Sequence, residues 1–313
     1  MATLTASMPM APTEVFACFK KLVVAYDFSP HADTALDYAL DLATKQNSEI
    51  ILVHVQGPSD EAIPAGEEAE ATHKVIPDLR ERLEQKAYHS RKLGVDTRWL
   101  LRAGSPAEGL ALMVADLQPH VLFLGAYGNN RLDRKVLGST AEALLRTLPC
   151  PVVTIGPKAV KKNFDPNQPE KVICPIDFPD DVHERLKIIS GVAKALCADV
   201  ELVHAVDVCH EHSLPHNATD IQFEFDLLVE WLQREGVATQ STLLYGAPEH
   251  VISERAQAVN AHYIMFGLHQ NGPFSSYSRK SLVAKVIKHA PCAIFTFAQS
   301  AGGQSLSIEV APT

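Results

Sequence analysis

Lys21-Leu-Val-Val-Ala-Tyr-Asp27-Phe28 recurs 150 residues later as Lys171-Val-Ile-Cys-Pro-Ile-Asp177-Phe178. The same offset superposes Glu49-Ile-Ile-Leu-Val-His54 on Asp199-Val-Glu-Leu-Val-His204. Each stretch is a short apolar run of strand length, rich in Val, Ile and Leu. The chain therefore contains a long internal repeat that begins with matching strands.

The repeat continues at a different offset. From its third strand onward the offset is 142, which places Gly125 on Gly267 and Pro149-Cys150 on Pro291-Cys292. A repeat of this length is a whole domain rather than a solenoid unit. We expect a first repeat over 17–157, a linker over 158–170, a second repeat over 171–298 and a tail over 299–313.

Apolar runs alternate with longer segments of helical spacing, which indicates parallel strands joined by crossover helices. In the first repeat the predicted strands are 20–27, 49–55, 96–102, 120–125 and 151–155. The predicted helices are 31–46, 67–93, 106–117 and 139–147. Ser29-Pro30 and Ser105-Pro106 are helix-start signals that support this assignment. The predicted fold is α/β, with two tandem Rossmann-like domains, each a five-stranded parallel sheet with helices on both faces.

Composition narrows the class of protein. The chain has 313 residues and a net charge of −9, which disfavours nucleic acid as a partner. No apolar stretch reaches the roughly 18 residues of a membrane span, and residues 1–15 do not resemble a secretory signal, so we expect a cytoplasmic protein. The six cysteines contain no C-x-x-C pair, and we expect reduced, mostly buried thiols.

A glycine-bearing loop follows the fourth predicted strand. It is Gly125-Ala-Tyr-Gly128-Asn-Asn-Arg131-Leu-Asp-Arg134-Lys135-Val-Leu-Gly138-Ser139-Thr140. Glycine allows close approach of a ligand to the backbone, and the N–H groups that begin a helix attract anions. The basic side chains add a local positive charge that suits a polyphosphate. Each of these residues taken singly has a plain explanation, turns for the glycines and a helix cap for Ser139. The combination of glycines, hydroxyls and basic residues favours a phosphate site.

This loop is where the chain resembles a known family. The spacing G-x2-G-x9-G-[S/T] is similar to the ATP-binding signature of universal stress proteins, whose domains are adenine nucleotide alpha hydrolase-like. The endings of the first two predicted strands and the Pro149-Cys150-Pro151 segment also resemble the family. The Walker pattern and the Rossmann G-x-G-x-x-G are absent.

The resemblance implies a nucleoside and phosphate site in the first repeat, with ATP as ligand and Mg²⁺ as a possible companion. The implied contacts are Asp27, Val55, Gly125, Gly128, Asn129, Gly138, Ser139 and Thr140. The alternatives are a charge at a helix N-terminus for Asp27 and a plain core position for Val55. The family commonly pairs domains through the fifth strand, which implies an intramolecular pseudo-dimer and leaves a homodimer open.

The second repeat departs from the signature. Gln270 stands in place of the second glycine, and Lys280-Ser281 replaces Gly138-Ser139. Side chains at both positions would crowd the phosphate path, so we expect no ATP there, although a shifted loop around Gly272 is an alternative.

A cluster of donor residues in the second repeat is a candidate metal site: Cys209, His210, His212 and His216. These are donor types that zinc prefers, but the spacing matches no standard zinc motif, and a plain exposed loop is the alternative. His54 and His204 are expected to be core or hydrogen-bonded residues, and Cys150 and Cys292 to serve packing.

The expected function is nucleotide-dependent regulation or protection in a stress response, with no catalytic residues assigned. One rival is a slow ATP hydrolase or phosphotransferase that uses Asp27 with Mg²⁺. Another is a scaffold whose second repeat binds a different ligand or a metal.

Overall fold

The computed structural model describes residues 19–57, 68–128, 137–148, 150–162, 168–176, 182–206, 218–269 and 275–299. The strands of the first repeat are β1 (Lys21–Ala25), β2 (Glu49–Gln56), β3 (Thr97–Ala103), β4 (Val121–Gly125) and β5 (Val152–Ile155). Its helices are α2 (Pro30–Gln46), α3 (Glu68–Lys92), α4 (Pro106–Leu117) and α5 (Ser139–Thr147). All of these were expected from the sequence, with ends that agree to about two residues.

The second repeat has the same order of elements. Its strands are β6 (Glu170–Pro175), β7 (Ala198–Val206), β8 (Thr239–Tyr245), β9 (Tyr263–His269) and β10 (Ala293–Gln299). Its helices are α6 (Val182–Leu196), α7 (Ala218–Arg234), α8 (Pro248–Ala258) and α9 (Ser275–His289). Glu170 thus belongs to β6 rather than to the linker, and Gln299 belongs to β10 rather than to the tail.

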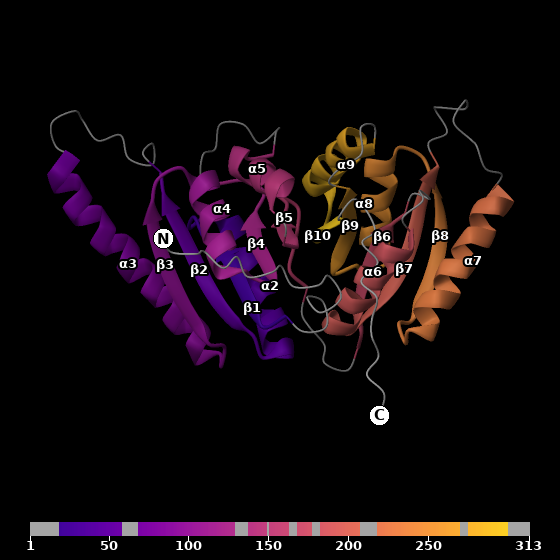
Figure 1. The fold of residues 1–313 in the computed structure, drawn as a ribbon, viewed down its shortest axis with the longest axis horizontal. Coiled ribbons are helices and arrows are strands. Elements are labelled where there is room, and N and C mark those ends of the chain that lie inside the picture. Colours follow the sequence, from indigo (N-terminus) through magenta and orange to yellow (C-terminus); the bar gives the residue numbers. More distant parts are fainter. Residues whose placement is uncertain are drawn as a thin grey trace, which may run out of the picture.

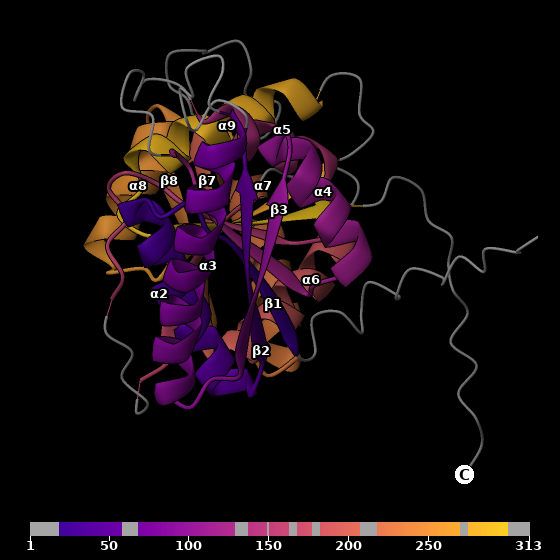
Figure 2. The ribbon, with the colours of Figure 1, turned by 90° about the vertical axis from the view of Figure 1, so that its left-hand side faces the viewer.

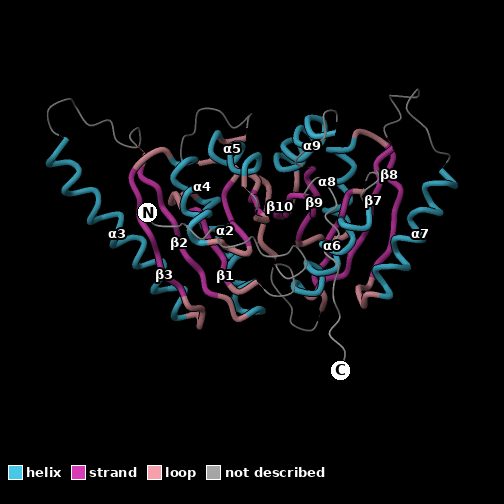
Figure 3. Tube along the Cα trace, viewed as in Figure 1, coloured by secondary structure: helices cyan, strands magenta, loops and turns pink. Residues whose placement is uncertain are grey.

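The ten strands in the described part of the chain form one sheet, in the order β3-β2-β1-β4-β5-β10-β9-β6-β7-β8 (Figure 1). Within each repeat the described pairs are parallel, as predicted. The two halves meet where β5 pairs antiparallel with β10, with Val153 opposite Phe295. In the tube view the strands run across the molecule from β3 to β8, and α3 and α7 lie at its two ends (Figure 3).

Helices cover both faces of the sheet. On one face α2, α3, α6 and α7 pack into a single apolar cluster that continues across the junction through β5 and β10. On the other face α4 and α5 cover the first repeat, and α8 and α9 cover the second. Seen from the end of the molecule, α2 and α3 lie on one side of β1–β3 and α4 lies on the other (Figure 2).

Polar and aromatic contacts also join the halves. Lys45 of α2 and Glu170 of β6 form an ion pair in which both side chains are buried. Tyr38 and Tyr263 stack edge to face with ring centroids 5.5 Å apart. Gln46 Nε2 donates to the carbonyl of Ala195 at 2.6 Å. The junction is therefore a packed interior with its own buried charge pair.

The repeat-matched histidines are hydrogen-bonded, as predicted. His54 Nδ1 lies 2.7 Å from the carbonyl oxygen of Tyr26, and His204 Nδ1 lies 2.8 Å from that of Ile176. Both bonds tie the second strand of a repeat to the end of its first strand.

The cysteine prediction is only partly right. Cys174 and Cys292 are buried and Cys150 is half-buried, but Cys197 is exposed at the end of α6. Burial raises the pKa of the Cys150 and Cys292 thiols to about 12, which agrees with a packing role.

Candidate functional site

The candidate site lies at the carboxyl ends of β1 and β4, which are neighbours in the sheet. The chain leaves β1 into α2 on one face and leaves β4 into α5 on the other. Strand order reverses between these two strands, and open α/β sheets bind ligands at such a crevice. The glycine loop therefore begins at the position in the fold where a ligand is expected.

Asp27 follows β1 and is half-buried. Its Oδ1 accepts from the backbone N–H of Ser29 at 3.0 Å, and Ser29 Oγ accepts from Ala32 N at 3.1 Å to cap α2. Phe28 between them has a φ of 61°, a left-handed conformation that is unusual for a bulky residue. The carboxylate is thus fixed by a tight turn at the start of α2.

Gly128 lies against this carboxylate. A Cβ built on Gly128 would stand 3.0 Å from Asp27 Oδ2, closer than most real Cβ contacts. The structure therefore brings together two predicted site residues that are about 100 positions apart in the chain.

Gly138 is the second position where a Cβ would make an unusually tight contact. Its N–H donates to the carbonyl of Ala126 at 2.9 Å, and a Cβ there would lie 3.0 Å from that same oxygen. Gly138 is the N-cap of α5, so Ser139 is its first residue and not its cap. The alternative in which Ser139 caps the helix is wrong, because Gly138 occupies the cap position.

Ser139 and Thr140 begin α5, with Ser139 exposed and Thr140 half-buried. The first N–H groups of a helix have no partner within the helix and carry a partial positive charge. The start of α5 can therefore donate to an anion. Glu142 in the same turn is one acidic group close to it.

Gly125 has a packing role that its sequence context did not reveal. A Cβ on Gly125 would lie 2.8 Å from the Cβ of His31, so glycine is needed for α2 to approach β4.

Val55 is a buried member of the core beneath α4 and α5. A Cβ on Gly109 of α4 would lie 2.8 Å from Val55 Cγ1. We did not predict this packing role of Gly109 from the sequence. A glycine inside a predicted helix is the signal that could have indicated it.

Aromatic and basic residues flank the turn after β1. The Tyr26 and Phe28 rings are 5.1 Å apart, and the Arg82 guanidinium lies 4.0 Å from the Phe28 ring centroid. Burial, and then a hydrogen bond to Asp33, raises the pKa of the Tyr26 phenol above its ordinary range. Tyr26 therefore stays neutral at physiological pH.

Several predicted residues lie outside the described residues. They are Asn129, the basic residues Arg131, Arg134 and Lys135, and the candidate metal ligands Cys209, His210, His212 and His216. Within the described ranges no group of three or more His, Cys, Asp or Glu side chains could hold a metal ion.

The second repeat differs at the corresponding site. Lys280, which the offset places on Gly138, lies inside α9 rather than at its start, because α9 begins at Ser275. Gly267, which corresponds to Gly125, lies against Phe297 and the aliphatic part of Arg185. Gln270 is outside the described residues. A helix start at the matched position is therefore found only in the first repeat.

Comparison with known proteins identifies the family. The model of the universal stress protein family matches residues 19–156 and again residues 169–296. The chain belongs to the universal stress protein family. A universal stress protein of Staphylococcus saprophyticus is 26% identical to it over 152 residues, which are 47% of this chain and 90% of that protein.

Solved structures of universal stress proteins share the fold across both repeats. One from Archaeoglobus fulgidus has a TM-score of 0.67 at 18% identity and covers 92% of this chain and 99% of its own. One from Pseudomonas aeruginosa has a TM-score of 0.59 at 17% identity and covers 90% of this chain and 94% of its own. In the described part of the chain, none of the helices could cross a membrane.

Proposed function

We propose that this universal stress protein binds one ATP in its first repeat and that occupancy of this site regulates the protein in a stress response. The observation that carries the proposal is the convergence of Asp27, Gly128 and the start of α5 at the β1–β4 crevice. At Gly128 and Gly138 a Cβ would meet Asp27 and Ala126 at 3.0 Å, so glycine lets this part of the chain pack closely against the end of β1 and the start of α5.

The chemistry of the residues fits a nucleotide phosphate. The N–H groups of Ser139 and Thr140 and their hydroxyls supply donors at a helix N-terminus. Asp27 is the carboxylate that would hold a nucleoside group or, with phosphates present, Mg²⁺. Gly125 and Val55 contribute packing, Gly125 against His31 and Val55 in the core beneath α4 and α5, and supply no donors.

The start of α9 supports restriction of ATP to the first repeat. At Lys280 the backbone N–H belongs to the interior of a helix, where it bonds to the preceding turn and is not offered to a phosphate. The two repeats would act as an intramolecular pseudo-dimer, an arrangement supported by the β5–β10 pairing.

Isothermal titration calorimetry tests the proposal. Gly138→Val should abolish ATP binding, because a branched side chain would collide with Ala126 O and cover the start of α5. Lys280→Val, at the matched position of the second repeat, is the control and should bind like the unmodified chain. Binding that survives Gly138→Val contradicts the site.

The rival enzyme function has its own test. A hydrolase that uses Asp27 with Mg²⁺ should turn over ATP rapidly and lose that turnover in Asp27→Asn. We expect turnover to be slow in the unmodified chain and in Asp27→Asn, since the Ser29 N–H holds the Asp27 carboxylate in the turn at the start of α2.

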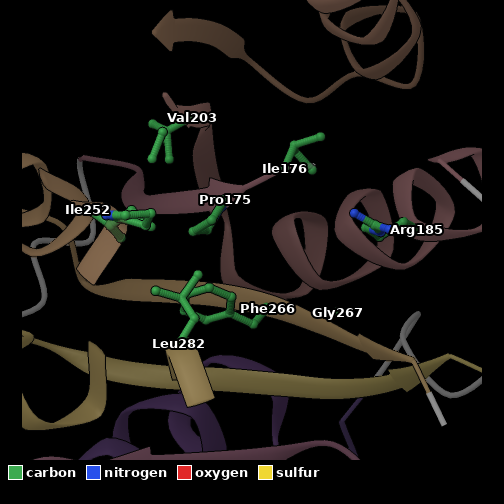
Figure 4. A pocket seen from close by; sticks show the side chains of 10 residues that line it. Pro175, Ile176, Arg185, Val203, Ile252, Phe266, Gly267 and Leu282 are labelled. Atoms are coloured by element: carbon green, nitrogen blue, oxygen red, sulfur yellow. The ribbon is translucent and has the colours of Figure 1, made fainter. Parts of the chain in front are cut away.

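A second ligand site in the second repeat is favoured by one observation. A cavity of about 60 Å³ lies between the ends of β6, β7 and β9 and the helices α6, α8 and α9 (Figure 4). It is lined by Pro175, Ile176, Arg185, Val203, Ala205, Pro248, Ile252, Phe266, Gly267 and Leu282.

The size and charge of this cavity limit its ligand. An engineered cavity that binds benzene has a volume of about 150 Å³, so a space of about 60 Å³ is too small for an adenine base. The buried guanidinium of Arg185 favours a small anionic group with an apolar part. Thermal-shift titration with short-chain carboxylates should stabilise the chain, and Arg185→Met should remove the effect. Equal stabilisation by the uncharged amides contradicts an anion site.

A further inference from the structure

Both described ends of the glycine loop of the first repeat pack against the second repeat. Ala126, between Gly125 and Gly128, is fully buried. It belongs to an apolar cluster whose other buried members all come from the second repeat. They are Ile173, Val203, Ile252, Ala256, Ala261, Ile264, Phe266, Val283, Val286, Ile287, Ala290, Cys292 and Ile294. The other loop residues Tyr127 and Leu137 pack against the same cluster.

A direct backbone contact links α9 to the end of β5, the strand beside β4. Gly156 follows β5, and a Cβ on it would lie only 2.0 Å from the carbonyl oxygen of Ile287. The backbone at the end of β5 therefore touches the backbone of α9, and only glycine permits that approach. Residues of the two repeats are in contact here without any intervening side chain.

Hydrogen bonds continue from that contact to the start of α5. The carbonyl of Ile155 accepts from Ala126 N at 2.8 Å, and the carbonyl of Ala126 accepts from Gly138 N at 2.9 Å. A continuous path thus runs from Ile287 through Gly156, Ile155 and Ala126 to the N-cap of α5. Its links are the packing contact between Ile287 and Gly156, the peptide bond between Gly156 and Ile155, and the two backbone hydrogen bonds.

We infer that α9 of the second repeat positions the nucleotide loop of the first, so that ATP affinity in one repeat depends on Ile287 in the other. This inference rests on the proposed function. The second repeat is then a built-in support for the nucleotide site, and the loss of its own phosphate signature does not make it dispensable. Ile287 is a positioning residue, because it acts through Gly156 and Ala126 and has no part in binding the phosphates.

The physical basis is preorganisation. A loop held in its binding conformation by dense packing loses little freedom when ligand binds, whereas a loosened loop must be ordered by the ligand. Shortening Ile287 removes side-chain atoms from beside Gly156 and from the apolar cluster that contains Ala126, and should raise the dissociation constant for ATP by roughly tenfold. Gly156→Ala should act in the same direction, since its methyl group forces α9 away from β5.

Calorimetric titration with ATP on the full chain tests the inference. Ile287→Ala and the milder Ile287→Val are compared with Ile221→Ala and Ile221→Val. Ile221 is a buried isoleucine of the same repeat on α7, at the far end of the sheet. Thermal unfolding of each variant reports its stability separately. We expect weaker ATP binding in both Ile287 variants, graded with the atoms removed, and unchanged affinity in both Ile221 variants at similar losses of stability.

The outcomes separate the inference from the proposed function. An unmodified chain that binds no ATP refutes the proposed function and the inference with it. Normal binding by the unmodified chain and by Ile287→Val and Ile287→Ala alike overturns the inference alone. Equal weakening by the Ile221 variants also overturns it, because the effect would then follow stability and not position.

Discussion

Replacement of Lys45 by methionine should loosen the junction between the two repeats. The Lys45 and Glu170 side chains are only 8% and 6% exposed, and they join α2 of the first repeat to β6 of the second. Removing one partner of a buried ion pair leaves the other charge buried and costs about 3–5 kcal/mol. At roughly 2 °C per kcal/mol for a large domain, Tm should fall by about 6–10 °C.

The loss should depend on pH. Burial raises the pKa of Glu170 above its ordinary value of 4.5, and Lys45 acts against that rise. Between pH 4.5 and the raised pKa of the folded state, Glu170 in the folded protein holds a proton that the unfolded chain has lost, so the contribution of Glu170 to stability falls as pH rises through this window. Without Lys45 the folded pKa rises further, and the fall in stability should extend to higher pH.

Differential scanning fluorimetry across pH 4–8 measures both effects. Lys45→Met combined with Glu170→Gln should regain most of the lost stability, since it removes both charges. Lys194→Met is the control, because the Lys194–Glu235 pair is nearly half-exposed on both sides and is worth about 0–1 kcal/mol. A loss for Lys45→Met no larger than that of Lys194→Met refutes the claim that a buried charge pair holds the junction.

Two further predictions concern titratable groups. Burial raises the pKa of the Cys292 thiol to about 12. Peptide mapping after alkylation at pH 8 should therefore find Cys292 unmodified and the exposed Cys197 modified. Fast labelling of Cys292 in the folded chain would contradict its packing role. Burial, helped by Lys162, Lys45 and Lys171, lowers the pKa of His262 to about 4, while its Nδ1 accepts from Lys171 N at 3.1 Å. The folded chain therefore binds fewer protons than the unfolded chain between pH 6.5 and 4, and stability is lost as pH falls through this range. Titration of the His262 ring by NMR checks it, and a midpoint near 6.5 is the contrary result; His262→Asn should lose that part of the pH dependence.

Much of the fold could be predicted from the sequence because its signals are local. Val-rich runs such as Leu22–Val24 alternate with helical segments, and proline at the first helical position marks the starts of α2, α4 and α8. Hydrophobic periodicity and the repeat offset were sufficient to predict each strand of the first repeat.

The candidate site was less predictable because its geometry depends on distant segments. The contact between Gly128 and Asp27, and the packing of Gly125 on His31, join residues far apart in the chain. The start of α9 at Ser275 differs from the repeat offset, since serines precede Lys280 and no glycine interrupts the helix. Nothing in the Gly-Ala-Tyr-Gly sequence indicates that Ala126 packs against the other repeat.

We propose a single ATP site in the first repeat that packs against the second repeat. Equilibrium dialysis of the full chain with saturating ATP measures the stoichiometry of binding directly. We expect one ATP per chain. Two ATP per chain, or none, would contradict it.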